Sequence, residues 1–323
     1  MQKPSTKAAI LIGIHGLAPK PLQSVLTRYW KNAIREGFQA NCDWTEPQKI
    51  PFEMVYWASL LHKTHLHRSK SKKKAVSYNK EPYIPSRPGT ILPYSPRRNI
   101  PLTEDIHTQT KLTLGRLFDQ IPLGKVVDFI FDRTARDLSI YQDPDEVKIN
   151  EKGETHPIHD LLKNELKRIL WKHRHKRICL IAHSMGSIIA YDVLHEISQN
   201  PFWHSNLRIE TLMTMGSPLA FQKVRSHFYP TAPRGLASLP ISTPEIISQE
   251  WLNYRDPLDH AALDTPLNEI FRSNAYGVHV QDKLVSNNYF NEAGDSNFHK
   301  SYGYLRSPEM SHALCKFLTS AEP

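Results

Sequence analysis

Short apolar runs recur along the chain, and most of them end at a turn that contains glycine, proline or aspartate. These runs predict strands over residues 8–14, 52–58, 178–182, 208–215, 250–255 and 276–285. Several are almost continuously apolar, which is typical of strands that helices cover on both faces. Apolar residues at helical spacing predict helices over residues 158–172 and 308–318. We therefore expect an α/β fold built on a doubly wound, mostly parallel sheet.

A serine lies where one of these strands meets a helix. The nucleophile-elbow pattern G-x-S-x-G, with alanine in place of the first glycine, is matched by Ala182-His183-Ser184-Met185-Gly186. Small residues are needed two positions either side of the serine, because strand and helix nearly touch there. A helix N-cap would also place a serine here, but it would not explain the apolar strand before it. Ser184 is therefore the expected nucleophile of a serine hydrolase.

A turn after the first strand is a candidate for holding the oxyanion of such a reaction. The strand over residues 8–14 runs directly into His15-Gly16-Leu17. In serine hydrolases of this class, a turn after an early strand supplies one backbone N–H, and the residue after the nucleophile supplies the other. The expected donors are Leu17 or Gly16, together with Met185. Alternatively, Gly16 only makes a tight turn.

Two aspartates compete for the role of the acid that orients the catalytic base. Asp256 follows the strand over residues 250–255 immediately, and Asp259 comes one turn later. Catalytic carboxylates in doubly wound hydrolases lie just past the carboxyl end of a strand, and both residues satisfy this rule. The aspartate that does not orient the base is expected to cap the turn, because Asp favours such positions.

The base should be a histidine that follows the acid if the chain order is Ser, Asp, His. The candidates are His260, His279, His299 and His312. His279 lies inside the last predicted strand and His312 inside the last predicted helix, so both side chains are more plausibly structural. His299 lies in the polar loop between these two elements, where this fold places its base. We therefore predict that His299 is the base.

Several segments together resemble the lipase-like α/β-hydrolases of the serine esterase type, and more closely a group of bacterial α/β-hydrolases that are named only by their fold. The resemblance spans nearly the whole chain and rests on residues 14–17, 55–58, 180–192, 216–218, Trp251 with Asn253, and 299–305. It implies the α/β-hydrolase fold and a triad of Ser184, His299 and either Asp259 or Asp256. It implies no particular substrate, because fold does not fix function.

The whole chain, residues 1–323, has the length of one α/β domain with an insertion. This insertion occupies residues 60–154. Its first part is rich in lysine, histidine and proline, a composition that predicts irregular structure, and its second part shows helical spacing. We expect either a cap that supplies an apolar acyl pocket over the active site or helices that pack against the sheet.

Charge suggests one further contact. The formal net charge is +9, and six basic residues between Lys63 and Lys74 occur without an acidic one. This segment could contact an anionic membrane surface, although a solvated loop is the plainer interpretation. We expect no nucleic-acid partner, because no binding motif accompanies the charge. We also expect no cofactor and no metal, because no carboxylate or cysteine completes a ligand set with His62, His65 and His67.

Composition favours a cytoplasmic protein. No run approaches the roughly 18 consecutive apolar residues that a membrane span needs, and the first residues lack the layout of a signal peptide. The three cysteines, Cys42, Cys179 and Cys315, are few and odd in number, so we expect reduced thiols. Oligomeric state has no signature in the sequence.

The function that the sequence favours is hydrolysis of a small-molecule or lipid carboxylic ester through an acyl-enzyme on Ser184. Thioester hydrolysis and acyl transfer use the same residues and stay open as alternatives. A different alternative is a non-catalytic scaffold that binds a lipid or a protein partner on the same fold.

Overall fold

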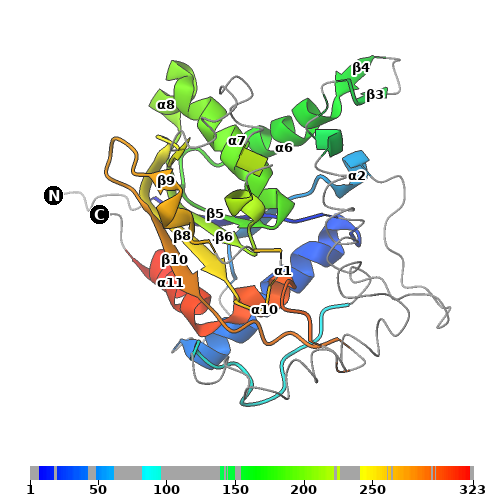
Figure 1. Ribbon diagram of the computed structural model, residues 1–323, viewed down its shortest axis with the longest axis vertical. Helices are drawn as coiled ribbons and strands as arrows, with labels where there is room; N and C mark the ends of the chain where they lie inside the picture. The colour runs from blue at the N-terminus through cyan, green and yellow to red at the C-terminus, as the bar shows by residue number, and fades with distance from the viewer. Residues whose placement is uncertain are drawn as a thin grey trace.

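A parallel sheet forms the centre of the protein (Figure 1). The computed structural model describes residues 7–17, 20–42, 49–61, 82–95, 139–141, 143, 145–149, 154–221, 224–225, 241–259, 261–262, 265–291, 294 and 296–320. Within these residues, six strands follow the order β10-β8-β6-β5-β1-β2, and every neighbouring pair is parallel. The strands are β1 (Ala9–Ile14), β2 (Phe52–Val55), β5 (Arg177–His183), β6 (Ile209–Met215), β8 (Ile247–Arg255) and β10 (Val280–Leu284). The predicted α/β fold with a parallel sheet is confirmed, and it is consistent with the α/β-hydrolase fold.

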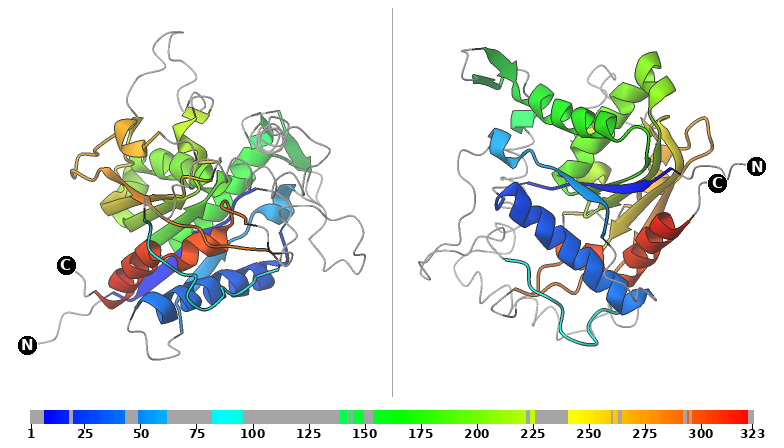
Figure 2. Two further views of the ribbon diagram at one scale, coloured as in Figure 1. Left: turned by 60° about the horizontal axis from the view of Figure 1, so that its bottom comes forward. Right: turned by 180° about the vertical axis from the view of Figure 1, so that it is seen from behind.

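Helices cover both faces of this sheet (Figure 2). One face carries the contacting helices α1 (Gln23–Asn41), α10 (Ser301–Arg306) and α11 (Pro308–Thr319). The opposite face carries α6 (Ile158–Lys172) and α7 (Met185–Gln199), with the short α8 (Pro201–Asn206) after α7. The remaining described elements are α2 (Ala58–Leu61), the β3–β4 pair (Val147–Ile149, Thr155–Pro157), the β7–β9 pair (Ile241–Ser242, Phe271–Arg272), and the 3-10 turns η1 (Pro218–Ala220) and η2 (Leu267–Glu269).

Each face of the sheet has its own apolar core. Leu166, Ile189 and Trp251 are among the buried residues between the sheet and the α6–α7 face. Trp30 and Leu314 are among those between the sheet and the α1–α11 face. Burial on both faces explains why β1 and β5 read as nearly unbroken apolar runs. Every residue of β5 is buried, and α7 begins at Met185, two residues after the strand ends.

The strand order reverses between β1 and β5, which are paired along six residues. In open α/β sheets, the crevice at such a switch point, outside the carboxyl ends of the strands, is where ligands bind. The loops after β1 and β5 both begin at this edge of the sheet. These are the loops that carry Gly16 and Ser184, so the topology alone brings the two segments together.

The observed bounds differ from the expected ones at several ends. The helix over residues 158–172 is present as expected, and α11 runs one residue further than 318. The last strand begins at Val280 rather than 276, so His279 precedes it and is exposed. Most of the insertion over residues 60–154 lies outside the described residues, as do His62, His65, His67 and the segment between Lys63 and Lys74. The expected cap and the membrane-facing segment therefore stay predictions.

Residues 82–95, within the insertion, form no helix or strand, and they are held to the body of the protein. The carboxylate of Glu36 on α1 accepts hydrogen bonds from the Tyr83 hydroxyl and from Ser86. The guanidinium of Arg306 donates to the carbonyl of Ile84 at 3.0 Å and pairs with Glu36 at 3.2 Å. Polar contacts therefore fix this part of the chain together with apolar packing, because Tyr83 and Ile84 also pack against the core on the α1–α11 face.

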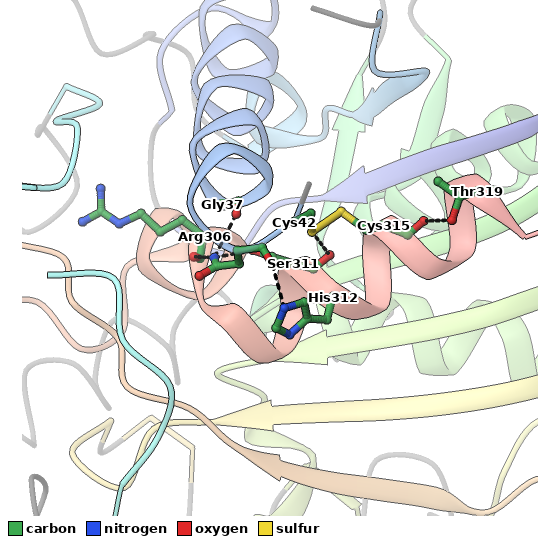
Figure 3. Close-up of a disulfide and its surroundings, with 8 residues drawn as sticks. Gly37, Cys42, Arg306, Ser311, His312, Cys315 and Thr319 are labelled. Carbon is green, nitrogen blue, oxygen red and sulfur yellow. Dashed lines mark hydrogen bonds between the residues drawn. A yellow bond between two sulfur atoms is a disulfide. The ribbon is translucent and has the colours of Figure 1, made fainter. Parts of the chain in front are cut away.

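The expectation of three reduced thiols is wrong for two of the cysteines. A disulfide joins Cys42, just after α1, to Cys315 on α11, while Cys179 is a free and buried thiol (Figure 3). Asn41 of α1 adds to the same junction, because its side-chain amide donates to the carbonyl of Arg306 and to the hydroxyl of Ser311, each at 3.2 Å. Sequence spacing could not reveal this pair, because 273 residues separate the two cysteines. The cytoplasmic location, which rested partly on free thiols, stays a prediction.

Neither a membrane span nor a metal cluster is found in the described part of the chain. None of the helices described there combines the length and the apolar character that crossing a bilayer requires. The same residues include no group of three or more histidine, cysteine, aspartate or glutamate side chains placed to hold a metal ion.

Candidate active site

Ser184 has the backbone strain of a nucleophile elbow. Its φ of 54° and ψ of −129° make it the only non-glycine residue with a positive φ among those described. The backbone holds this conformation, because the Ser184 N–H donates to the carbonyl of Met215 at 3.1 Å and its own carbonyl accepts from Ser187. A Cβ at Gly186 would lie 2.7 Å from the carbonyl oxygen of Ile14, so the pattern requires glycine there. Strained residues of this kind cluster at active sites.

Ser184, His299 and Asp259 form one hydrogen-bonded chain. The Nε2 atom of His299 lies 3.0 Å from the hydroxyl oxygen of Ser184, and Nδ1 lies 2.9 Å from both carboxylate oxygens of Asp259. The Asp259 side chain is 1% exposed and that of His299 is 15% exposed. Since a carboxylate can only accept, Nδ1 carries the proton and Nε2 is left to accept from the serine. This is the geometry by which an imidazole activates a hydroxyl.

Asp256 occupies the other expected position, and its hydrogen bonds go elsewhere. Its carboxylate accepts the backbone N–H of Leu258 at 2.7 Å and that of Asn287 at 2.5 Å. Burial, together with the negative charge of Asp259, raises the pKa of Asp256 from 3.8 to about 6, although the two backbone hydrogen bonds act in the opposite direction. Asp256 therefore caps the turn after β8, the role expected of the aspartate that does not contact the base.

Tyr304 is a functional candidate that sequence reasoning missed. This fully buried residue of α10 donates its hydroxyl to the Asp259 carboxylate at 2.7 Å and accepts the backbone N–H of Asp256 at 3.0 Å. Burial and the nearby carboxylates raise the pKa of Tyr304 well above 10, so the hydroxyl keeps its proton. Only the block over residues 299–305 pointed to this region, and nothing in it distinguished Tyr304 from Tyr302.

Gly216, directly after β6, makes room for the acid and the base. Its φ of 55° lies in the left-handed region, which disfavours residues with a Cβ. A Cβ at this position would lie 2.8 Å from Asp259 Oδ2 and 3.0 Å from His299 Nδ1. Conformation and space therefore both require glycine at this point.

Two of the expected oxyanion donors, Gly16 and Met185, lie beside Ser184. A Cβ at Gly16 would lie 2.6 Å from the Cβ of Ser184, and Met185 is the buried first residue of α7. The turn is held by His15, whose Nδ1–H donates to the Gly16 carbonyl at 2.8 Å while Nε2 accepts the backbone N–H of Trp57 at 3.2 Å. Leu17 is the last described residue before a gap at residues 18–19, and the choice between it and Gly16 stays open.

Two of the rejected histidines make no contact with this chain of hydrogen bonds. His312 donates from Nε2 to the carbonyl of Asn41 at 2.7 Å, a link between α11 and α1 that supports a structural role (Figure 3). His279 is exposed before β10, and His260 lies outside the described residues.

Comparison with known proteins adds one family. Residues 151–227 match the family model of lecithin:cholesterol acyltransferase. The matched segment runs from before α6 to beyond β6, so it includes Ser184 and Gly216 but stops before Asp259 and His299. Over this segment, the chain is similar to α/β-hydrolase-fold enzymes of the acyltransferase and esterase kind. No curated protein matches the chain.

Proposed function

We propose that the protein is a serine hydrolase that cleaves a carboxylic ester through an acyl-enzyme intermediate on Ser184. The observation that supports this most directly is the hydrogen-bonded chain from Ser184 through His299 to Asp259, which starts at a strained elbow. Similarity of residues 151–227 to an acyltransferase family supports ester chemistry at the same serine. The name of that family favours a lipid ester as the substrate, and the proposed reaction requires no cofactor.

In the proposed reaction, His299 removes the proton from Ser184 as the hydroxyl attacks the ester carbonyl. The buried carboxylate of Asp259 stabilises the imidazolium that forms and holds the ring in one tautomer. Backbone N–H groups of Met185 and of either Leu17 or Gly16 bind the developing oxyanion. His299 then protonates the leaving alcohol, and water releases the acyl group by the same steps in reverse.

Acyl transfer is a second candidate, because the matched family is named for it. The acyl-enzyme would be the same, and an alcohol rather than water would accept the acyl group from Ser184. The fate of the acyl group separates the two. Turnover of an ester in the presence of increasing alcohol should give a fixed yield of free acid if water is the acceptor, and an increasing yield of new ester if the alcohol is.

The decisive test is labelling of the protein by a fluorophosphonate probe, combined with hydrolysis of a p-nitrophenyl ester series. Ser184→Ala should lose both the label and the turnover. The matched control is Ser198→Ala on α7, the helix that follows Ser184. The Ser198 hydroxyl donates to the Leu194 carbonyl at 2.6 Å. This control should keep both. A folded wild-type protein with neither label nor turnover would favour the non-catalytic scaffold.

Contact between residues 63–74 and an anionic membrane is a separate proposal, supported by the charge of that segment alone. Binding to vesicles that contain phosphatidylserine should weaken with salt and with replacement of the lysines between Lys63 and Lys74 by glutamine. Binding that is unchanged in the glutamine variant would contradict the proposal.

A further inference from the structure

Three consecutive carbonyl groups around His299 accept hydrogen bonds from two buried side chains. The side-chain amide of Asn287 donates to the carbonyl of Phe298 at 2.7 Å and to that of Lys300 at 2.9 Å. The Nε2–H of His183 donates to the carbonyl of His299 itself at 2.8 Å. Burial and the neighbouring His299 hold the pKa of His183 well below its usual 6.5, so His183 is neutral. The side chains of Asn287 and His183 thus hold the backbone that carries the base.

This segment lacks the regular hydrogen bonding that would otherwise fix it. Between β10 and α10, the described residues contain one isolated bridge, from Phe290 to Ser296, and no strand or helix. Buried backbone groups need partners, and here side chains supply them. These side-chain contacts fix the backbone at His299 together with a few backbone hydrogen bonds, such as that from the Lys300 N–H to the Asn297 carbonyl at 3.1 Å.

Asn287 is itself fixed at both ends. Its backbone N–H donates to the Asp256 carboxylate at 2.5 Å, and its side-chain oxygen accepts the N–H of Tyr289 at 3.3 Å. It passes so close to α10 that a Cβ at Gly303 would lie 1.6 Å from its Oδ1 atom. Asn287 is 3% exposed, so solvent cannot replace these contacts.

We propose that Asn287 is a positioning residue for the base: its amide clamps the two peptide groups that flank His299, and Asp256 holds Asn287 in place. This inference rests on the proposed function, because it assigns a role around the base of that reaction. Asp256 would then support catalysis without contacting the imidazole, because it holds Asn287, and Asn287 in turn holds the loop that carries His299. A base displaced by about 1 Å loses on the order of 10²-fold in rate.

Asn287→Ala tests the clamp, and Asn274→Ala is its matched control. Asn274 is also buried, and its amide also donates to two carbonyls, those of Pro244 and Ile247, which lie at the start of β8, at the opposite end of that strand from Asp259. We expect Asn287→Ala to lower kcat on the order of 10²-fold with little change in KM. Fluorophosphonate labelling should slow in parallel. Asn274→Ala should change kcat less than about twofold, even if it lowers the melting temperature equally.

A folded Asn287→Ala enzyme with kcat within about twofold of wild type would overturn the proposal, as would an equal loss of kcat in Asn274→Ala. If Asn287→Ala does not fold, Asp256→Asn provides the second variant. It keeps the Asn287 amide but cannot accept both backbone N–H groups, so kcat should fall about tenfold with KM unchanged. An unchanged kcat in this folded variant would equally overturn the proposal.

A spectroscopic readout separates failure of the clamp from failure of the proposed function. The Nδ1 proton between His299 and Asp259 should give a low-field proton NMR signal, which His299→Gln removes. Asn274→Ala should leave this signal in place, and Asn287→Ala should shift or broaden it, whether or not the wild type hydrolyses esters. An unaltered signal in Asn287→Ala would contradict the clamp, whereas an inert wild type with the expected shifts would contradict only the proposed reaction.

Discussion

The two halves of the candidate site are built in different ways. The nucleophile half is one continuous segment, β5 through α7, and hydrogen bonds of the sheet hold it on both sides. The acid and base half joins two separate segments, the turn after β8 and the stretch that runs from the end of β10 through α10. Side-chain hydrogen bonds from Asp256, Asn287 and Tyr304 hold these segments together. The first half is thus rigid because of its backbone, and the second because of a few polar side chains.

This difference predicts where single substitutions should affect catalysis without unfolding the protein. A change in the elbow alters a backbone that the sheet already determines, so its effects should appear as loss of folding or loss of the nucleophile. A change in the acid and base half should displace the imidazole while the sheet stays intact. The variants below test this division, beginning with the largest expected effect.

Replacement of each aspartate separately should have unequal effects. Asp259→Asn should lower kcat on the order of 10⁴-fold, as for the orienting carboxylate of serine-protease triads, because the amide no longer stabilises the imidazolium or fixes its tautomer. Asp256→Asn should lower kcat about tenfold, because it only loosens a hydrogen-bonded turn. Steady-state hydrolysis of the best p-nitrophenyl ester measures both. Equal losses, or a larger loss in Asp256→Asn, would contradict the assignment of Asp259.

Gly216→Ala should displace the acid and the base together. The added Cβ would lie within 3.0 Å of both Asp259 and His299, so we expect kcat to fall on the order of 10²-fold. The matched control is Gly277→Ala. Gly277 has a similar φ, 77°, but no atom lies within 4 Å of the position of its Cβ.

Both glycine variants should lose about 1–2 kcal/mol of stability from the left-handed backbone, measured by urea unfolding. Only Gly216→Ala should lose activity. If Gly277→Ala were as inactive as Gly216→Ala, backbone strain rather than crowding of the imidazole would be the cause of the lost activity. Catalysis would then depend less on the positions of Asp259 and His299 than their contacts indicate.

The free energy of unfolding of the protein should depend on pH through Asp256, in the acid and base half. Its pKa is raised from 3.8 to about 6, mainly by burial, so the folded protein binds this proton more tightly than the unfolded chain does. The resulting stability of about 3 kcal/mol is fully present below about pH 4 and is lost as the pH rises through about 6.

Asp256→Asn removes this titration, because an amide stays neutral. The difference in free energy of unfolding between Asp256→Asn and wild type should therefore shift by about 2–3 kcal/mol in favour of the variant between pH 4 and pH 7. Urea unfolding at several pH values measures it, and comparison of the two proteins cancels the other carboxylates. A difference that does not change with pH would show that burial does not raise the pKa of Asp256.

The contrast between the two halves also explains what sequence could predict. The elbow could be predicted because Ala182, Ser184 and Gly186 are neighbours in the chain, and the requirement for small residues follows from their own strand and helix. The fold class followed from the same apolar runs. Asp256 and Asp259 could not be told apart, because both follow β8 and only contacts with His299, 40 residues beyond Asp259, distinguish them.

Long-range contacts account for the other differences. Tyr304 reaches Asp259 across 45 residues, and Cys42 pairs with Cys315 across 273. A tyrosine in the short segment over residues 301–306, or a cysteine among few others, gives no local signal of such a partner. Asn287 was visible only as part of a polar loop, although it makes two of the three side-chain hydrogen bonds to the carbonyl groups of residues 298–300.

We expect the smallest effect on kcat from replacing one tyrosine in each half of the site by phenylalanine. Tyr304→Phe removes a hydrogen bond to the Asp259 carboxylate. A hydrogen bond to a charged group contributes about 1.5–3 kcal/mol, and only the part of this contribution that stabilises the transition state more than the ground state affects kcat. We therefore expect kcat to fall about tenfold. Tyr191→Phe, on α7 in the nucleophile half, removes an equally buried hydroxyl that donates to the Ser242 carbonyl at 2.9 Å. It should lower stability by about 1 kcal/mol and leave kcat within about twofold. Hydrolysis rates and urea unfolding of the two variants give both quantities. Loss of kcat in Tyr191→Phe, or its retention in Tyr304→Phe, would mean that the division between a backbone-held nucleophile and a side-chain-held base does not govern catalysis.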